Sequence, residues 1–228
     1  MAPKITHRDN FIWLFFALIF LLFSGAVFAQ IESELGQRLV NYSLTITMLI
    51  AVWSMQRKQA RWLNPKIGMS LVIASLMIGG SILDDARVAI VQLVIVILFL
   101  SLTTFLAWRQ VMFSGHVDRN KIVGAICIYM LIGVVWAFAY LLVEVLFPGS
   151  MNGLDHKEWQ HNLEDMIYYS MVTLTTLGYG DITPDQPLVR FLAYMESITG
   201  IFYTTVLVAS LIGVRLATYK PDEDKTED

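Results

Sequence analysis

The chain has 228 residues, of which 56% are hydrophobic and only 15% are charged, and its formal net charge at pH 7 is -3. Soluble domains contain about 45–50% apolar and about 25% charged residues, so this composition is displaced toward that of membrane proteins. The small net charge argues against a nucleic-acid partner, and the single cysteine, Cys127, excludes a disulfide framework within one chain.

Six apolar segments approach the roughly 20 residues that a membrane-spanning helix needs. In chain order they cover residues 11–29, 39–55, 67–83, 88–108, 122–147 and 189–218. We therefore predict an all-α membrane protein with six transmembrane helices. The first segment follows a basic start and also fits a cleaved signal peptide, although its apolar stretch is longer than the usual 7–15 or so residues of such peptides.

The loops between the predicted spans differ in charge. Those after the second and fourth spans are basic, whereas those after the first and third each carry two acids and one base. Positively charged loops stay on the cytoplasmic side. We therefore predict an integral protein of the plasma or inner membrane with both termini in the cytoplasm.

The fourth predicted span contains no basic residue between positions 88 and 108. A voltage sensor needs charges in this helix, because each charge moved across the membrane contributes about 2.3 kcal/mol per 100 mV. Residues 1–115 are therefore predicted to form a four-helix membrane domain that is not a conventional voltage sensor. These helices are either a scaffold or a receiver for a lipid or another ligand.

A half-helix and a glycine-rich loop are predicted between the fifth and sixth spans. Residues 163–176 are too few to cross the membrane at about 1.5 Å per residue, and they begin with Glu164 and Asp165, which suit a helix N-terminus. Irregular backbone at membrane depth must be buried in protein or line an aqueous path. We predict a re-entrant pore helix within a pore domain at 116–219, followed by a disordered acidic tail at 220–228.

The chemistry of the loop points to a cation. Removing water from a monovalent cation requires several oxygen atoms that replace the hydration shell. Gly178 and Gly180 alternate with Tyr179, and glycine adopts positive φ at little cost, so an extended strand can turn its carbonyls one way. Thr176 can add a hydroxyl oxygen. A loop of this kind, repeated around an axis, is a selectivity filter.

The run from Thr176 to Asp181, Thr-Leu-Gly-Tyr-Gly-Asp, resembles the TVGYGD signature of the tetrameric potassium channels, with Leu177 where valine is usual. The flanking residues 173–175 and 182–184 fit the same pattern, and the resemblance covers about 122–218. It implies a homotetramer of six-helix subunits; the arginine-rich sensor helix is lacking here, because the fourth predicted span contains no basic residue. It also implies K⁺ coordination by the carbonyls of four residues and one hydroxyl, with Gly180 shaping the outer mouth and the Tyr179 ring packed outward against the pore helices. The coordinating residues are Thr176, Leu177, Gly178 and Tyr179.

The resemblance also assigns residues around the filter. Asp181 supports it through a hydrogen bond to Tyr168, which replaces a pore-helix tryptophan, or is simply a solvated loop acid. Thr175 is grouped with these support residues. Gly200, inside the sixth span, matches a gating hinge; the alternative is close packing behind the filter.

Four further titratable residues keep two interpretations each. Glu144 and Glu196 are acids at membrane depth, where acids are usually functional or paired. Each either makes a structural hydrogen bond behind the filter or belongs to the ion path. His156 and His161 in the outer loop are either plain surface residues or a site that senses pH or binds metal.

These observations predict a potassium-selective channel subunit that conducts K⁺ passively through a tetrameric pore. It is predicted to be no enzyme, to need no cofactor besides permeant K⁺, and to contact the lipid bilayer and its own copies but no nucleic acid. The first alternative is a weakly selective monovalent cation channel with the same fold. The second is a transporter or membrane enzyme, for which the sequence offers no metal-ligand spacing, nucleophile motif or internal repeat.

Overall fold

The computed structural model describes residues 10–29, 34–54, 86–113, 119–154 and 162–218. The chain is mostly helical, as predicted, with one short pair of strands. The described elements are α1 (Asn10–Ala29), α2 (Glu34–Ser54), α4 (Ala86–Phe113), α5 (Arg119–Leu146), β1 (Met151–Asn152), α6 (Leu163–Leu174), β2 (Thr183–Pro184) and α7 (Pro187–Thr218). The predicted span at 67–83, the boundary at 115–116, the tail at 220–228, and both His156 and His161 lie outside the described residues.

Three of the described helices are long and apolar enough to cross a membrane. Their apolar windows are Phe11–Phe28 in α1, Arg87–Val111 in α4 and Asn120–Leu146 in α5. The apolar part of α2, Tyr42–Ala51, is shorter. Helix α7 has 32 residues and is about 48 Å long at 1.5 Å per residue, but it is not among the three. The protein is therefore an integral membrane protein, whereas the full count of six spans stays a prediction.

Polar side chains inside these helices bond to their own backbone. Thr47 Oγ1 donates to the Ser43 carbonyl at 2.8 Å, and Thr104 Oγ1 donates to the Leu100 carbonyl at 2.8 Å. Hydrocarbon offers no hydrogen-bond partner, so a hydroxyl there must find one within the protein. These threonines are thus compatible with membrane-buried helices.

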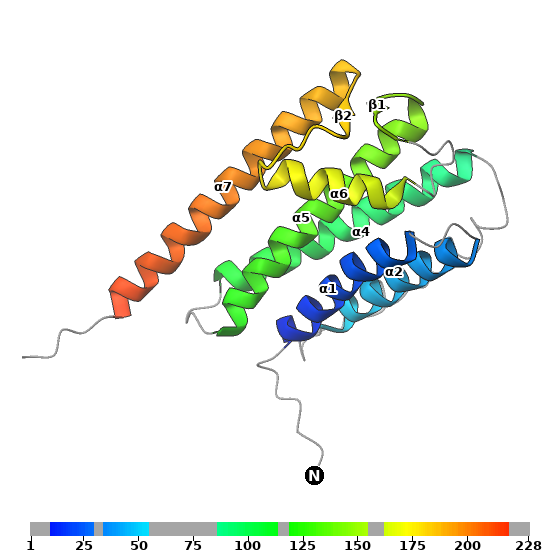
Figure 1. Ribbon diagram of the computed structural model, residues 1–228. Helices are drawn as coiled ribbons and strands as arrows, with labels where there is room; N and C mark the ends of the chain where they lie inside the picture. The colour runs from blue at the N-terminus through cyan, green and yellow to red at the C-terminus, as the bar shows by residue number, and fades with distance from the viewer. Residues whose placement is uncertain (1–9, 30–33, 55–85, 114–118, 155–161, 219–228) are drawn as a thin grey trace, which may run out of the picture.

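The helices pack around α5. Helices α1 and α2 form a hairpin whose α1 member lies against α5, and α4 runs along another side of α5 (Figure 1). The core lies between α1, α4, α5 and α6, where Leu14, Leu93, Tyr140 and Met166 have at most 1% of their surface exposed. Helix α5 is therefore the scaffold on which the rest of the described chain is assembled.

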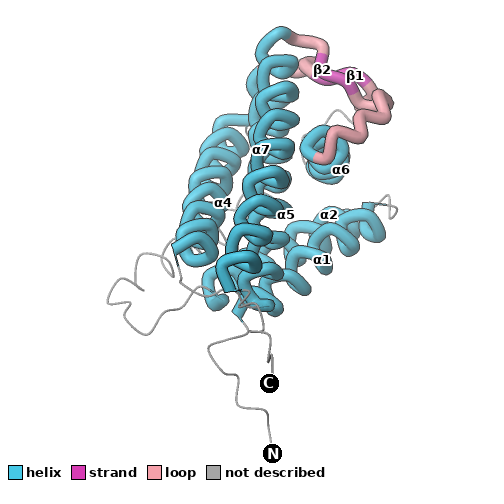
Figure 2. Tube along the Cα trace, turned by 90° about the vertical axis from the view of Figure 1, so that its left-hand side faces the viewer, coloured by secondary structure: helices cyan, strands magenta, loops and turns pink. Residues whose placement is uncertain are grey.

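Helix α6 is held between α5 and the N-terminal half of α7. Figure 2 shows α6 end on, with the loop that follows it running alongside toward the paired strands β1 and β2. Its bounds, Leu163–Leu174, agree with the half-helix predicted at 163–176. At 12 residues it cannot span a membrane, and the chain turns back after it.

Candidate functional site

The loop after α6 leaves the helix in an unusual backbone conformation. Gly178 and Gly180 have φ values of 57° and 81°, in the left-handed region that favours glycine. Thr176 also has a positive φ, of 60°, which is a genuine outlier for a β-branched residue. Strained backbone of this kind, which costs on the order of 1–3 kcal/mol, concentrates at functional sites.

The amide groups of the loop are bonded back to α6. The N–H of Thr176 donates to the Thr173 carbonyl at 3.0 Å, and the N–H groups of Leu177 and Gly178 both donate to the Val172 carbonyl, at 2.9 and 3.3 Å. Within the described chain, no hydrogen bond is made to the carbonyl oxygens of residues 176–179. The first three N–H groups of the loop are thus bonded to α6, and the carbonyl oxygens of residues 176–179 are left available.

The loop has little cover within one chain. Residues 175–181 are all exposed, with 56% of Leu177 and 67% of Tyr179 accessible. The Tyr179 ring, which the resemblance places outward against the pore helices, is therefore mostly uncovered in a single subunit. Apolar side chains this exposed next to strained backbone indicate a surface that another molecule covers.

Tyr168 and Asp181 bridge the loop from α6 to its exit. The Tyr168 hydroxyl donates a hydrogen bond to Asp181 Oδ2 at 2.7 Å. This bond holds the pKa of the Asp181 carboxyl below its ordinary value. The contact expected from the sequence is present, and its role in supporting a filter is taken up under the proposed function.

The exit of the loop is tied to the chain after α5. Strands β1 and β2 pair antiparallel, with Met151 opposite Pro184 and Asn152 opposite Thr183. Gly153 follows with a φ of 89°, and a Cβ atom there would lie 2.2 Å from the Asp181 carbonyl oxygen. Only glycine fits this position, because both its conformation and its distance to the loop exclude a side chain.

Glu144 organises the turn that carries β1. Its Oε1 accepts a hydrogen bond from the Gly149 N–H at 2.7 Å, and its Oε2 accepts from the Ser150 N–H, the Ser150 hydroxyl and the Met151 N–H at 3.0, 2.7 and 3.2 Å. A carboxylate with four donors is satisfied as an anion. Of the two interpretations of Glu144, the structure favours the hydrogen-bonding one.

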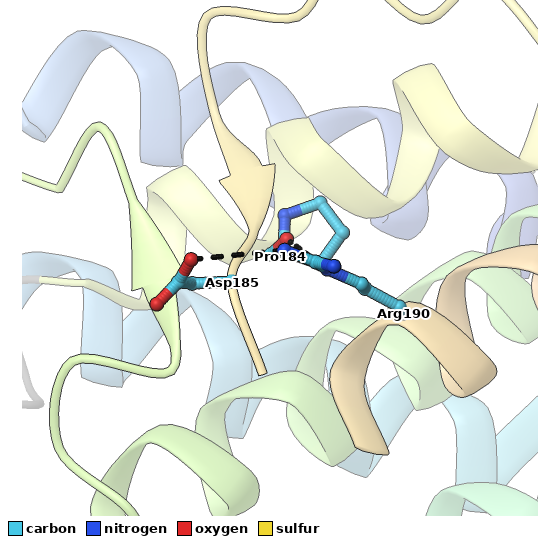
Figure 3. A network of polar contacts seen from close by, with 3 residues as sticks. All are labelled: Pro184, Asp185 and Arg190. Carbon is cyan, nitrogen blue, oxygen red and sulfur yellow. Dashed lines mark hydrogen bonds and ion pairs between the residues drawn. The ribbon is translucent and has the colours of Figure 1, made fainter. Parts of the chain in front are cut away.

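The start of α7 is fastened to the same region (Figure 3). Arg190 Nε donates to the Pro184 carbonyl at 3.2 Å, and Arg190 Nη2 lies 3.8 Å from Asp185 Oδ1. Both charged side chains are more than half exposed, so this ion pair contributes little stability. Its geometric effect is to hold β2 against the first turn of α7.

Glu196 is buried where three helices meet. It has 0% of its surface exposed. The Tyr140 hydroxyl of α5 lies 2.6 Å from Glu196 Oε2, and Ser170 Oγ of α6 lies 2.5 Å from Glu196 Oε1 and 2.6 Å from the Gly133 carbonyl oxygen. A fully enclosed side chain bonded on both oxygens is not exposed to an aqueous path in this structure. The hydrogen-bonding interpretation of Glu196 is therefore favoured as well.

Gly200 lies against the end of α6. A Cβ atom at this position would lie 2.1 Å from the Leu174 carbonyl oxygen, which also accepts a hydrogen bond from Tyr129 at 3.1 Å. Close packing alone therefore requires glycine here. Helix α7 is continuous through Gly200, and the hinge stays a prediction.

The sequence did not single out Tyr140 and Ser170, the partners of Glu196. A phenol and a serine hydroxyl in apolar segments were the available signal, but a serine in a helix often bonds to its own backbone. Among the described residues, no cluster of three or more His, Cys, Asp or Glu side chains could hold a metal ion.

Comparison with known proteins gives a match over the part of the chain that contains this loop. Residues 126–215 match a protein-family model described as "Ion channel". This range contains most of α5, all of α6, the loop and nearly all of α7. No solved structure matches the chain at a significant level.

The curated relatives include several potassium channels. The chain is 30% identical over 76 residues to "Two pore potassium channel c" of Oryza sativa, which is 32% of this chain and 17% of that protein. It is 31% identical over 88 residues to "Voltage-gated potassium channel" of Aeropyrum pernix, 39% of this chain and 26% of that protein. It is 33% identical over 87 residues to "Protein LctB" of Bacillus caldotenax, 36% of this chain and 62% of that protein. The similarity thus spans less than two thirds of each of these relatives.

Proposed function

We propose that the chain is a subunit of a potassium-selective channel, in which K⁺ passes down its gradient between loops supplied by four copies. The observation that carries the proposal is the state of the loop backbone. The N–H groups of residues 176–178 are bonded to α6, whereas the carbonyl oxygens of residues 176–179 accept no hydrogen bond within the described chain. Free carbonyls on a strained, anchored strand are the ligands that can replace the water of K⁺.

In this proposal, Thr176, Leu177, Gly178 and Tyr179 contribute carbonyl oxygens, and Thr176 adds its hydroxyl. Gly180 shapes the outer mouth. Leu177 replaces the usual valine, and because its side chain carries no ligand atom, it contributes only its carbonyl oxygen in this proposal. The similarity of residues 126–215 to the ion-channel family and to potassium channels supports the same assignment.

Support residues hold this strand from two sides. Tyr168 and Asp181 connect α6 with the loop exit at 2.7 Å, and Thr175 Oγ1 donates to the Met171 carbonyl at 2.7 Å at the loop entry. A loop anchored at both ends loses little further freedom when it binds an ion. We therefore assign these three residues to filter support.

The tetramer is proposed from the surfaces left open. One chain supplies one strand of a filter, and a ring of four oxygens at each level needs four chains. Helix α7 carries exposed apolar side chains at helical spacing, and we propose that neighbouring copies cover these together with Leu177 and Tyr179. The α7 residues are Phe191, Tyr194, Ile198, Ile201 and Phe202.

We infer the orientation from the loop charges, which favour termini in the cytoplasm and a loop exit on the outside. We place the protein in the plasma or inner membrane. The protein is proposed to act without catalysis and without a resident cofactor, because conduction requires only the pore and the ion gradient.

Flux into reconstituted lipid vesicles tests this function. A downhill K⁺ gradient should drive rapid K⁺ uptake that continues in the absence of any second solute, and Na⁺ uptake should be much slower. Comparable K⁺ and Na⁺ uptake would favour the weakly selective cation channel. Uptake that requires a coupled solute would favour a transporter and contradict the proposal.

Light scattering of the purified protein in detergent tests the assembly. The expected protein mass is four times 25.9 kDa, apart from the bound detergent. A monomer that still conducts would contradict the tetramer.

A further inference from the structure

The short contacts around Glu196 fix the number of protons that this group of side chains must hold. Three short oxygen–oxygen contacts form one chain: Tyr140 Oη to Glu196 Oε2 at 2.6 Å, Glu196 Oε1 to Ser170 Oγ at 2.5 Å, and Ser170 Oγ to the Gly133 carbonyl oxygen at 2.6 Å. Each contact needs one hydrogen, because two oxygens this close repel when no proton lies between them. The network therefore needs three protons.

The neutral hydroxyls supply two of the three. A serine or tyrosine hydroxyl has one proton to donate, and a backbone carbonyl has none. Because the Gly133 carbonyl can only accept, the Ser170 proton lies on that contact. The proton between Ser170 and Glu196 must then come from the carboxyl group of Glu196 itself.

We propose that Glu196 is held as a neutral carboxylic acid and that, in this form, it is a positioning residue for the helix that carries the filter loop. Its Oε1–H donates to Ser170 Oγ, Ser170 donates to the Gly133 carbonyl, and Tyr140 donates to Oε2. This arrangement joins α5, α6 and α7 behind the loop. Loss of the proton leaves Ser170 with one hydrogen for two contacts, so α6 loses its bond either to Glu196 on α7 or to the Gly133 carbonyl on α5.

The surroundings of Glu196 favour the neutral form. The side chain is fully enclosed, and an isolated buried carboxylate is costly. The titratable groups that interact with it are phenols: Tyr129 and Tyr140 on α5 and Tyr169 on α6. Phenols are uncharged near pH 7, so none of these three groups supplies a positive charge that would stabilise an anion.

The network reaches the loop through one turn of α6. Ser170 lies on the same helix as Val172, whose carbonyl accepts the amides of Leu177 and Gly178. Ser197, the neighbour of Glu196 on α7, donates to the Thr173 carbonyl at 3.3 Å. A shift of α6 at Ser170 therefore moves the groups that hold the loop backbone. This consequence rests on the proposed function of the loop, whereas the protonation of Glu196 does not.

Infrared spectroscopy of the purified full-length protein in lipid tests the protonation. At pH 7 the wild type should show a protonated carboxyl C=O band that shifts in D₂O and is lost in Glu196→Gln. Asp185→Asn, which replaces an exposed acid of the surface ion pair, should leave that band unchanged. Identical bands in wild type and Glu196→Gln would overturn the neutral-acid assignment, whether or not the protein conducts.

Selectivity tests the positioning role. A glutamine amide can donate to Ser170 and accept from Tyr140, so Glu196→Gln should keep the K⁺/Na⁺ permeability ratio of the wild type. Glu196→Ala should lower that ratio at least about tenfold. Raising the pH should lower the ratio more in the wild type than in Glu196→Gln, since Glu164 titrates in both proteins and only the wild type can also lose the Glu196 proton.

Each outcome has a distinct meaning. If the wild type is not K⁺-selective, the proposed function fails, and the infrared result still decides the protonation. If the wild type is selective and assembled Glu196→Ala keeps the same ratio, the positioning role is overturned while the function stands. Light scattering shows whether Glu196→Ala still assembles. If it does not, the pH comparison between the wild type and Glu196→Gln tests the positioning role instead.

Discussion

Tyr168 in the middle of α6 and Asp181 at the exit of the loop are 13 residues apart in sequence and joined by a hydrogen bond of 2.7 Å. Between them runs the strained backbone that we propose as the filter. The bond therefore closes the loop on its own helix. It restrains the outer carbonyls from the side of α6, in addition to the pairing of β1 with β2 that holds the loop exit.

The first prediction concerns that hydroxyl. Tyr168→Phe removes the donor and keeps the ring, so the loop exit should become less restrained and the K⁺ current should decline faster during sustained conduction. Single-channel recordings in K⁺ measure the open lifetime. Tyr42→Phe on the exposed surface of α2 is the matched control. Equal lifetimes in wild type and Tyr168→Phe would refute the support role.

Substitution of Gly200 by alanine distinguishes close packing from a gating hinge at this position. A Cβ atom there would lie 2.1 Å from the Leu174 carbonyl, whereas a Cβ atom at Gly213 in the same helix meets nothing within 4 Å. Gly200→Ala should therefore lower the free energy of unfolding by about 1–3 kcal/mol through overpacking, and Gly213→Ala should not lower it. Thermal unfolding in detergent measures both. A stable Gly200→Ala protein with altered open probability would instead support the hinge.

The buried position of the Glu164 carboxyl leads us to expect that stability depends on pH. Its carboxyl lies against α1, since a Cβ atom at Gly25 would be 3.0 Å from Oε2, and Oε2 has no hydrogen-bond partner among the described residues. Burial and the neighbouring charge of Asp165 raise its pKa from 4.5 to about 7. The folded state thus holds this proton more tightly than the unfolded state.

The higher pKa of Glu164 in the folded state means that the protein should lose stability as the pH rises. The stabilisation from the bound proton is fully present below pH 4.5 and is lost as the pH rises through about 7. The unfolding temperature of the wild type should therefore fall between pH 5 and 8 relative to that of Glu164→Gln, which has no proton to lose. Parallel curves for the two proteins would contradict the prediction.

Helix α4 predicts weak voltage dependence. The described helix carries Arg87 near its start and Arg109 near its end, with none of the charged residues between them that a field could move. Open probability should change little with voltage, and any slope should depend on the permeant ion. Conductance–voltage curves of wild type and Arg87→Gln in symmetric K⁺ test this. A steep curve that flattens in Arg87→Gln would show that α4 is a voltage sensor.

The helices could be predicted from the sequence because their apolar length is a local property. The spans predicted at 11–29 and 122–147 correspond to α1 at Asn10–Ala29 and α5 at Arg119–Leu146. The glycine-rich loop was also predictable, since Gly178 and Gly180 stand at the positions where the backbone adopts positive φ.

The contacts that hold the loop were not predictable to the same degree. Glu196 lies 26 residues from Ser170 and 56 from Tyr140, so no local pattern relates the three. Gly200 satisfies either a hinge or a close contact, and only its distance to the Leu174 carbonyl shows that contact. The pairing of β1 with β2 likewise depends on the register between distant segments.

The reversal potential of the wild-type current, with K⁺ on one side of a lipid bilayer and Na⁺ on the other, tests the central claim most directly. The free carbonyls of residues 176–179 predict a potential strongly displaced toward that of K⁺, and Tyr179→Asp should move it toward zero because the loop loses its aromatic support. A wild-type potential near zero, or one that Tyr179→Asp leaves unchanged, would contradict the assignment of this loop as a potassium filter.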